Sequence, residues 1–234
     1  MALAGRMPDD EPSSLRVRRE RQRAFWRERY LEEPAFFGEA ESGFARWCLP
    51  LLRAEKGLDS ILELGCGYGR DSRFLASEGF RVVGVDLTTV RPDETSSSRE
   101  TPSRFRLIES DAAEYLARVP SQKFDAVYSN MFFNMDFSES EHRSLMKAIR
   151  SALRPRGLHL YSARSTFDPW YGRGRSVGPD TFEASPGGAI IHFFSMEYVD
   201  RLAEGLFTPV ERSDQAEGGE DFPIRLLYVV DRRT

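Results

Sequence analysis

The chain has 234 residues, with 33 Lys and Arg against 37 Asp and Glu, so its formal net charge is −4. This length favours one large domain, and a hydrophobic content of 40% is ordinary for a soluble globular protein. No apolar stretch is long enough to predict a membrane helix, and the polar N-terminus is not typical of a signal peptide. The acidic balance argues against a dedicated nucleic-acid binder. With only two cysteines, the chain predicts no disulfide framework and favours a cytoplasmic location.

The N-terminal region predicts a polar tail followed by two helices. Residues 1–13 are expected to be disordered, because they contain two prolines and few apolar side chains. A helix is expected from Ser14 until Pro34 interrupts it, and a second over residues 41–52, whose apolar residues form a stripe. Together, residues 1–54 predict a helical cap on the domain that follows.

Arginines crowd the first of these helices, between Arg16 and Arg29. Such a run is usually a solvated helix face, and that is one interpretation. The other is a site for an anion or an acidic substrate.

From residue 55 onward, short apolar strands alternate with helices. This alternation predicts an α/β fold, a doubly wound and mostly parallel sheet with helices on both faces. One helix is missing from the pattern, because residues 87–104 are polar and proline-containing and predict a mobile loop. Strands are expected at residues 60–64, 80–85, 105–108, 124–128 and 158–162, and helices at 71–79, 113–117 and 139–153.

The last third of the chain breaks the alternation. Residues 165–189 are rich in Gly, Pro and Arg and predict a long loop, and residues 165–192 are expected to form a lid over a substrate. A helix is then expected over 195–205. Two final strands, at 208–212 and 224–230, predict an antiparallel hairpin that completes the sheet of the domain, which spans residues 55–234.

The motif that carries chemistry is the segment from Ile61 to Ser72, where three glycines alternate after a buried strand and before a helix. Glycine lacks a Cβ, so its backbone can turn with a positive φ and approach a ligand closely. Ligands of doubly wound sheets bind at the carboxyl ends of the strands. The dinucleotide pattern G-x-G-x-x-G would need a third glycine at the position of Arg70, which counts against an NAD-dependent oxidoreductase.

Acidic residues accompany the first three strands. Glu63 would repel a pyrophosphate but can orient loop amides or an ammonium group. Asp86 follows Gly65 by 86 − 65 = 21 residues, and its carboxylate can accept both hydroxyls of a ribose. Asp111, at the end of the third strand, can meet an adenine edge. These features favour S-adenosylmethionine as the cofactor over NAD.

With these elements in this order, the chain resembles class I S-adenosylmethionine-dependent methyltransferases. The resemblance implies a Rossmann-like sheet of seven strands, with an antiparallel strand seven between strands five and six. It also implies that the glycine loop packs on the methionine part of the cofactor, with the ribose at Asp86 and the adenine amine at Asp111. The cofactor contacts predicted in this way are Glu63, Gly65, Cys66, Gly67, Gly69, Asp71, Asp86, Leu87, Asp111, Ala112 and Asn130.

More narrowly, residues 36–38 and 66–72 look like small-molecule methyltransferases related to tellurite-resistance and thiopurine methyltransferases. In those proteins an aromatic N-terminal segment closes over the cofactor, a role that falls here to Trp26, Tyr30, Phe36 and Phe37. The alternative is that these aromatic residues only pack helices. For Asp71 the alternative is a helix cap.

Methyl transfer requires in-line alignment of a nucleophile and exclusion of water, and a base helps when the nucleophile is protonated. We expect Tyr128, Asn130 and His192 to be the catalytic residues, although His192 is alternatively a histidine satisfied within a strand. Arg164 is a candidate to pair with a substrate carboxylate. The substrate contacts predicted here are Trp26, Tyr30, Phe37, Phe133, Arg164, Trp170, Tyr171 and His192.

The sequence therefore predicts a methyltransferase that acts on an O, N or S nucleophile of a small molecule. We expect no metal, no membrane partner and no clear nucleic-acid partner. One alternative is an RNA or protein methyltransferase that grips its polymer with the arginine run. Another is a non-catalytic subunit that binds S-adenosylmethionine. The acceptor and the oligomeric state stay open.

Overall fold

The computed structural model describes residues 11–89, 103–184, 188–219 and 222–234. The expectations for residues 1–10 and 90–102 therefore lie outside the described residues. The helices are α1 (Glu11–Glu32), α2 (Gly43–Ala54), α3 (Arg70–Ser77), α4 (Ala112–Arg118), α5 (Glu139–Ala152) and α6 (Met196–Ala203). The strands are β1 (Ser60–Leu64), β2 (Arg81–Asp86), β3 (Phe105–Glu109), β4 (Phe124–Asn130), β5 (Leu153–Arg164), β6 (Arg175–Gly178), β7 (Thr181–Glu183), β8 (Ile190–His192), β9 (Phe207–Glu217) and β10 (Ile224–Arg233).

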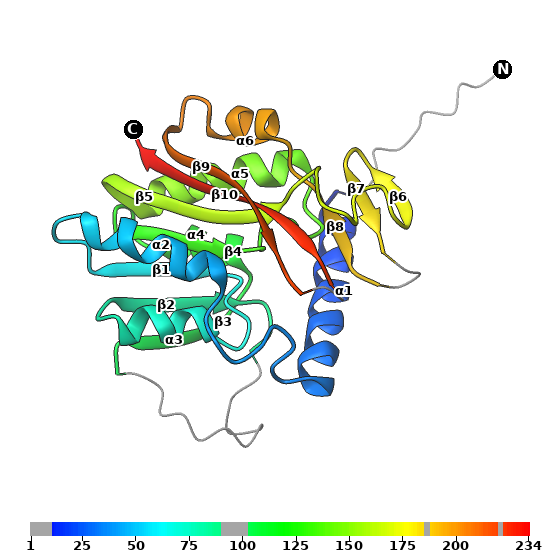
Figure 1. Ribbon diagram of the computed structural model, residues 1–234, viewed down its shortest axis with the longest axis horizontal. Helices are drawn as coiled ribbons and strands as arrows, with labels where there is room; N and C mark the ends of the chain where they lie inside the picture. Colours follow the sequence, from blue (N-terminus) through cyan, green and yellow to red (C-terminus); the bar gives the residue numbers. More distant parts are fainter. Residues whose placement is uncertain (1–10, 90–102, 185–187, 220–221) are drawn as a thin grey trace.

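The large sheet has seven strands in the order β3-β2-β1-β4-β5-β10-β9 (Figure 1). The strands from β3 to β5 pair in parallel, whereas β10 is antiparallel to both β5 and β9. The seventh strand of this sheet therefore lies between the fifth and the sixth. The predicted fold class and the predicted hairpin are confirmed.

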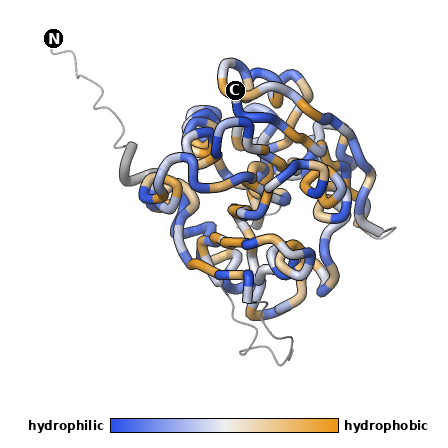
Figure 2. The backbone as a smooth tube through the Cα atoms, turned by 90° about the vertical axis from the view of Figure 1, so that its left-hand side faces the viewer, coloured by the Kyte–Doolittle hydropathy of each residue, from blue (hydrophilic) through white to orange (hydrophobic). Residues whose placement is uncertain are grey.

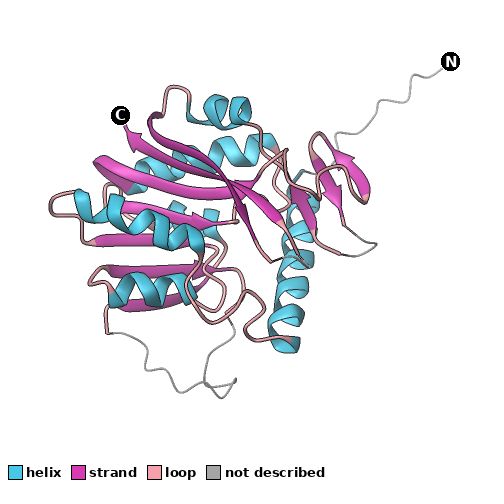
Figure 3. Ribbon diagram, viewed as in Figure 1, coloured by secondary structure: helices cyan, strands magenta, loops and turns pink. Residues whose placement is uncertain are grey.

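Helices cover both faces of the large sheet (Figure 3). On one face α2 and α3 pack through a core that includes Phe44 and Leu75. On the other face α4, α5 and α6 pack through a second core, which includes Leu116, Ile149 and Leu202. Because helices occupy both faces, the carboxyl ends of the parallel strands are the edge left for a ligand.

Side-chain caps set the starts of several helices. The side chain of Ser42 accepts a hydrogen bond from the backbone N–H of Ala45 at the start of α2. Ser138 and Glu141 form a reciprocal capping box at the start of α5. By contrast, α3 follows Gly69, whose φ of +80° is left-handed and whose position carries no side-chain cap. The glycine loop thus enters α3 through a turn that favours glycine.

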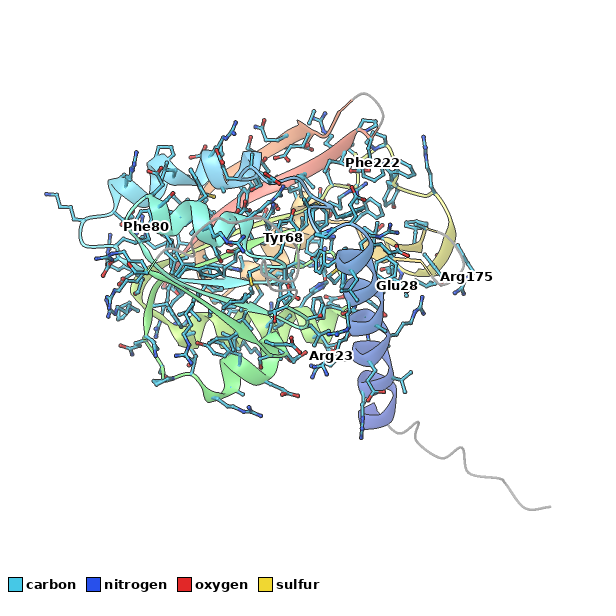
Figure 4. The ribbon with its side chains drawn as sticks, turned by 90° about the horizontal axis from the view of Figure 1, so that it is seen from below. Arg23, Glu28, Tyr68, Phe80, Arg175 and Phe222 are labelled. Carbon is cyan, nitrogen blue, oxygen red and sulfur yellow. The ribbon has the colours of Figure 1, made fainter. Side chains whose placement is uncertain are left out.

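The segment after β5 is not the long loop expected for residues 165–189. It contains β6 and β7, which pair with β8 as a three-stranded antiparallel sheet. The sequence did not predict this sheet, because its glycines and arginines are typical of a loop. Glu183 of β7 is buried and forms ion pairs with Arg175 of β6 and Arg21 of α1, which support the sheet. In Figures 1 and 4, α1 stands at one end of the large sheet, next to this small sheet.

None of the described helices is long and apolar enough to cross a membrane. Figure 2 shows hydrophobic and hydrophilic residues interspersed along the chain.

The fold makes a prediction for Phe133, which was expected to touch substrate but is fully buried against Tyr161 and His142. Phe133→Ala should lower the free energy of unfolding by about 3–5 kcal/mol, because it removes a ring from a packed core. The measurement is denaturant unfolding. The matched control is Phe167→Ala, at a side chain that is 77% exposed, which should change stability by no more than about 0.5 kcal/mol. Equal effects of the two substitutions would contradict this placement.

Candidate active site

A cavity of about 1050 Å³ lies at the carboxyl ends of the parallel strands. Its floor is formed by the glycine loop after β1 and by the ends of β2 and β4. The inner face of α1 and the small sheet close it from the opposite side. The cavity is at the upper end of the range typical of small-molecule sites, so it offers room for a cofactor together with a second molecule.

The glycine loop comes close to aromatic rings at two positions. Gly65 has a φ of +71°, and a Cβ there would lie 2.8 Å from the ring of Phe132. Gly67 has a φ of +54°, and a Cβ there would lie 2.9 Å from the hydroxyl of Tyr30. Both glycines, and Cys66 between them, line the cavity. The predicted contacts at these residues are therefore brought together at the cavity wall.

Gly69 differs from these two glycines. It does not line the cavity, and a Cβ there would lie 2.8 Å from the ring of Phe105. A glycine is required at position 69 because the turn into α3 is left-handed and because the backbone packs against Phe105 of β3. The predicted cofactor contact at Gly69 is replaced by this structural role.

Asp86 ends β2 and reaches into the cavity next to Leu87. Its carboxylate accepts hydrogen bonds from the backbone N–H of Gly67 at 2.8 Å and of Thr88 at 3.0 Å. Loss of solvation raises the pKa of Asp86 to about 6, although the hydrogen bonds from Thr88 and Gly67 favour the ionised form. A carboxylate placed in this way can accept hydrogen bonds from hydroxyl groups of a ligand.

Asp71 is buried and accepts hydrogen bonds from several elements. The backbone N–H and the hydroxyl of Ser42 donate to it at 2.8 and 2.7 Å, and the Tyr128 hydroxyl donates at 2.8 Å. The side chain of Asn130, at the end of β4, is 3.4 Å away. The alternative role of Asp71 as a cap of its own helix is wrong, because these donors all come from outside α3.

Two further acids of the predicted set line the cavity. Glu63 of β1 is buried and accepts a hydrogen bond from Ser72, and burial raises its pKa well above the usual range of a carboxyl. Asp111 caps α4 by accepting a hydrogen bond from the backbone N–H of Glu114 at 3.0 Å. Ala112 follows it along the cavity wall. The three strand-end acids therefore surround one cavity, as the sequence predicted.

One face of α1 forms the roof. Its lining residues Gln22, Phe25, Trp26, Arg29 and Tyr30 recur at helical spacing. The ring of Trp26 stacks on Tyr30 with centroids 5.7 Å apart and lies 6.0 Å from the ring of Phe37. The aromatic N-terminal residues therefore lie at a cavity and do not merely pack one helix on another.

The segment after α1 is bound to the glycine loop. Tyr68 of that loop donates a hydrogen bond to the backbone oxygen of Gly38 at 2.6 Å and accepts one from the N–H of Phe37 at 3.2 Å. Arg70 donates to the backbone oxygen of Phe37. Figure 4 shows Tyr68 near the centre of the molecule, between α1 and the large sheet. These contacts hold the aromatic segment over the loop.

The arginine run of α1 binds acids of the domain beneath it. Arg18 lies 2.9 Å from Glu141 of α5, and Arg19 lies 3.3 Å from Asp111. Neither expectation for the run is correct at these positions, because these side chains are neither a solvated face nor a free anion site. Partly exposed pairs of this kind contribute about 0.2–1 kcal/mol each, so α1 is held by several weak contacts.

Aromatic rings from several elements line the cavity. Trp170 packs on Phe222 of the β9–β10 hairpin with centroids 4.9 Å apart, and its indole N–H donates to the backbone oxygen of Pro223 at 3.0 Å. The sequence predicted Trp170 as a substrate contact, and it lines the cavity. Other aromatic rings of the lining are Phe132, Phe137, Phe182 and Phe193.

Several predicted side chains do not line the cavity. Tyr128 is fully buried and donates to Asp71, so it positions that carboxylate and does not meet a substrate as a catalytic residue. Phe133 belongs to the core beneath the wall. Tyr171 points to the small sheet, where its hydroxyl donates to Asp180 at 2.7 Å. Their predicted contacts with substrate are corrected accordingly.

His192 also lies outside the lining. Its Nδ1 atom lies 2.8 Å from the Thr181 hydroxyl, and its ring packs against His142 and Phe194. Burial lowers the pKa of His192 below its usual value. This placement agrees with the alternative of a histidine within a strand and removes the reason to assign it as the catalytic base.

Arg164 lines the cavity, but its charge is already paired. It makes two hydrogen bonds to the carboxylate of Asp168, at 2.7 and 2.6 Å, and both residues are buried. A buried, two-bond pair of this kind leaves little attraction for a substrate carboxylate. The predicted role of Arg164 is therefore corrected to support of the wall.

The sequence missed other residues of the site. Tyr68 and Arg70 were visible inside the glycine motif, and Phe25 follows from the helical spacing with Trp26 and Arg29. Asn134 and Glu217 carried no signal, because their positions depend on the path of a loop and on the register of a hairpin. Among the described residues, no group of three or more His, Cys, Asp or Glu side chains could hold a metal ion.

Comparison with known proteins agrees with this geometry. Residues 61–157 match the family model described as a methyltransferase domain. Glycine N-methyltransferase of Rattus norvegicus is 32% identical over 145 residues, which cover 56% of this chain and 49% of that protein. The chain spans about half the length of this relative.

Solved structures share the fold over more of the chain. The 1,6-didemethyltoxoflavin-N1-methyltransferase of Burkholderia thailandensis, with its substrate and S-adenosylhomocysteine bound, has a TM-score of 0.67 at 19% identity, covering 99% of this chain and 93% of the other. TehB from Haemophilus influenzae has a TM-score of 0.57 at 15% identity, covering 83% of this chain and 63% of the other.

Residues 61–157 therefore match a methyltransferase domain, and the seven-stranded sheet that they contribute to has the fold of the solved methyltransferases.

The ion pairs of α1 make a prediction about its docking. Arg18→Glu places a negative charge against Glu141 and Asp136, which should loosen α1 from the cavity. Hydrogen exchange of the α1 backbone amides should then become faster by about fivefold or more. The control is Arg23→Glu on the same helix, at an exposed side chain (Figure 4), which should leave the exchange unchanged. Unchanged exchange in Arg18→Glu would show that these pairs do not hold the helix.

Proposed function

We propose that this protein transfers the methyl group of S-adenosylmethionine to a small, flat and largely apolar acceptor. The observation that carries the proposal is a cavity that combines two kinds of lining. It contains the glycine loop with Asp86 and Asp111, and it contains many aromatic rings, Trp170 among them. This combination suits a polar cofactor together with an apolar acceptor.

In this proposal Asp86 accepts hydrogen bonds from the ribose hydroxyls, and Asp111 with Ala112 meets the adenine. Gly65 and Gly67 lie under the methionine part, next to Glu63. The sulfonium makes the methyl group electrophilic, and the residues of this chain align the acceptor and exclude water. Trp26, Tyr30 and Phe37 would close the roof, with residues 1–54 as a helical cap and the described part of residues 165–192 as a lid.

The kinship to small-molecule methyltransferases is part of this proposal. Its support is the aromatic segment that Tyr68 and Arg70 hold over the glycine loop. The relative from Burkholderia thailandensis binds 1,6-didemethyltoxoflavin in the same fold. Because that relative binds a compact molecule, compact small molecules are the first class of acceptor to test.

A polymer acceptor is less well supported. The arginines that were expected to grip RNA or protein include Arg18 and Arg21, which are bound to Glu141 and Glu183. A non-catalytic subunit would keep the same cavity, so only turnover separates it from an enzyme.

Binding and turnover test the proposal directly. Isothermal titration should give micromolar dissociation constants for S-adenosylmethionine and S-adenosylhomocysteine and no heat of binding for NAD. Incubation of labelled S-adenosylmethionine with a panel of small aromatic amines, phenols and thiols should transfer label to at least one acceptor. Tight cofactor binding without any methylated product would favour the non-catalytic alternative, and NAD binding would contradict the cofactor assignment.

The ionisation of Asp86 predicts how cofactor affinity depends on pH. Only the ionised carboxylate accepts hydrogen bonds from both ribose hydroxyls, and its pKa is about 6. Affinity for S-adenosylhomocysteine should therefore fall about tenfold between about pH 7.5 and about pH 5, as the ionised fraction falls. Titration calorimetry at each pH measures it.

The control for this prediction is Asp86→Asn, which removes the titrating group and keeps its shape. The variant should bind more weakly at neutral pH and should lose most of the pH dependence. If the variant retains both the affinity and the pH profile of the unchanged protein, the ribose does not lie on Asp86.

A further inference from the structure

Glu217 is a carboxylate of the cavity that no step above uses. It ends β9 and lines the cavity together with Gly218 and Ile224 of the same hairpin. Its Oε1 atom is buried and has no hydrogen-bond partner among the described residues. A Cβ on Gly43, the first residue of α2, would lie 2.8 Å from this oxygen, so the side chain is pressed against the start of that helix. Its place is therefore set by packing.

Several charges of the cavity wall are paired, whereas Glu217, like Asp86, has no cationic partner among the described residues. Arg164 is bound to Asp168, Arg18 to Glu141 and Arg19 to Asp111. Arg70 is bound to the Phe37 backbone and lies 3.5 Å from Asp71. The wall thus offers an incoming molecule few free cations. The buried Oε1 atom of Glu217, which has no hydrogen-bond partner among the described residues, belongs to an acid.

A second unpartnered acceptor faces the same cavity. Asn134, in the loop after β4, is 3% exposed, and its side-chain oxygen has no hydrogen-bond partner among the described residues. Buried polar atoms are nearly always hydrogen-bonded, so an unpartnered pair of acceptors indicates a ligand that supplies donors. A carboxylate ligand supplies none, whereas an amine supplies several.

The surroundings of Glu217 suit an arylalkylamine. The same hairpin presents Phe222 and, through Pro223, holds Trp170 at the wall. Aromatic faces attract cations as well as flat rings. A molecule with a ring among these side chains can direct its ammonium group to Glu217.

We propose that Glu217 recognises the amino group of the methyl acceptor, and that the acceptor of this site is an arylalkylamine, an amine joined to an aromatic ring through an alkyl chain. This inference rests on the proposed function, and it narrows the acceptor to an amine that Glu217 binds as a cation or N–H donor. Where the bound ammonium nitrogen is itself the nucleophile, it transfers a proton to the Glu217 carboxylate before its lone pair accepts the methyl group. Burial raises the pKa of Glu217 above its usual value. The nearby charge of Asp71 also raises this pKa, whereas the charge of Arg70 lowers it. A bound ammonium group would favour its ionised form.

The test compares three probes with the same ring: 2-phenylethylamine, 2-phenylethanol and 3-phenylpropionate. Each is titrated calorimetrically into the complex of the protein with S-adenosylhomocysteine near neutral pH. The amine should bind at least about tenfold more tightly than the carboxylate. In Glu217→Gln, which keeps the shape of the side chain, affinity for the amine should fall by about tenfold, while affinity for the alcohol stays within about twofold.

The matched control is Glu211→Gln, at an exposed glutamate of the same strand, which should change none of these affinities. Affinity for S-adenosylhomocysteine should stay within about threefold in both variants. A preference for the carboxylate, or an amine preference that survives in Glu217→Gln, would overturn the inference while leaving the proposed function intact. A large loss of S-adenosylhomocysteine affinity in Glu217→Gln would place Glu217 at the amino group of the cofactor and would also overturn it. Absence of S-adenosylhomocysteine binding in the unchanged protein would defeat the proposed function itself.

Discussion

The buried carboxylate of Asp71 holds together the elements on which the cavity rests. It lies in the first turn of α3, directly after the glycine loop, and accepts hydrogen bonds from Ser42 before α2 and from Tyr128 of β4. A buried carboxylate without partners is very costly, so these donors and the acid fix one another in place. The glycine loop is thereby held between β1 and α3 at a defined height above the strand ends. The contacts proposed for the methionine part of the cofactor depend on that position.

A second constraint closes the cavity from the other side. The roof helix α1 has an aromatic inner face around Trp26, while its arginines bind acids of α5, β7 and the loop after β3. The weakness of each pair suits a roof that must release product, since no single strong contact has to break. The acidic residues behind the net charge of −4 therefore have two different roles. Asp111 and Glu141 bind arginines of the roof, while Asp86 and Glu217 face the cavity without a cationic partner.

Much of this arrangement follows from local sequence. The positions of Asp86 and Asp111 were predictable because a parallel sheet brings successive strand ends to one edge. The place of the antiparallel strand between β5 and β9 was predicted from the resemblance to class I S-adenosylmethionine-dependent methyltransferases. The small sheet was not predictable, since β6, β7 and β8 are three or four residues long and depend on the buried Glu183 for support. The sequence predicts His192 as a base because it ends residues 165–192, which are expected to form a lid over the substrate. Tertiary packing turned its ring to His142, and no local pattern carries that information.

The central claim is that the cavity holds an adenosyl cofactor with its sulfur toward Trp170. A crystal structure of the complex with S-adenosylhomocysteine tests it most directly. The account predicts both ribose hydroxyls within hydrogen-bond distance of the Asp86 carboxylate, the adenine beside Asp111 and the sulfur pointing to the space between Phe132 and Trp170. A cofactor bound in the reverse direction, with its adenine against Trp170, or bound outside this cavity, would contradict the account.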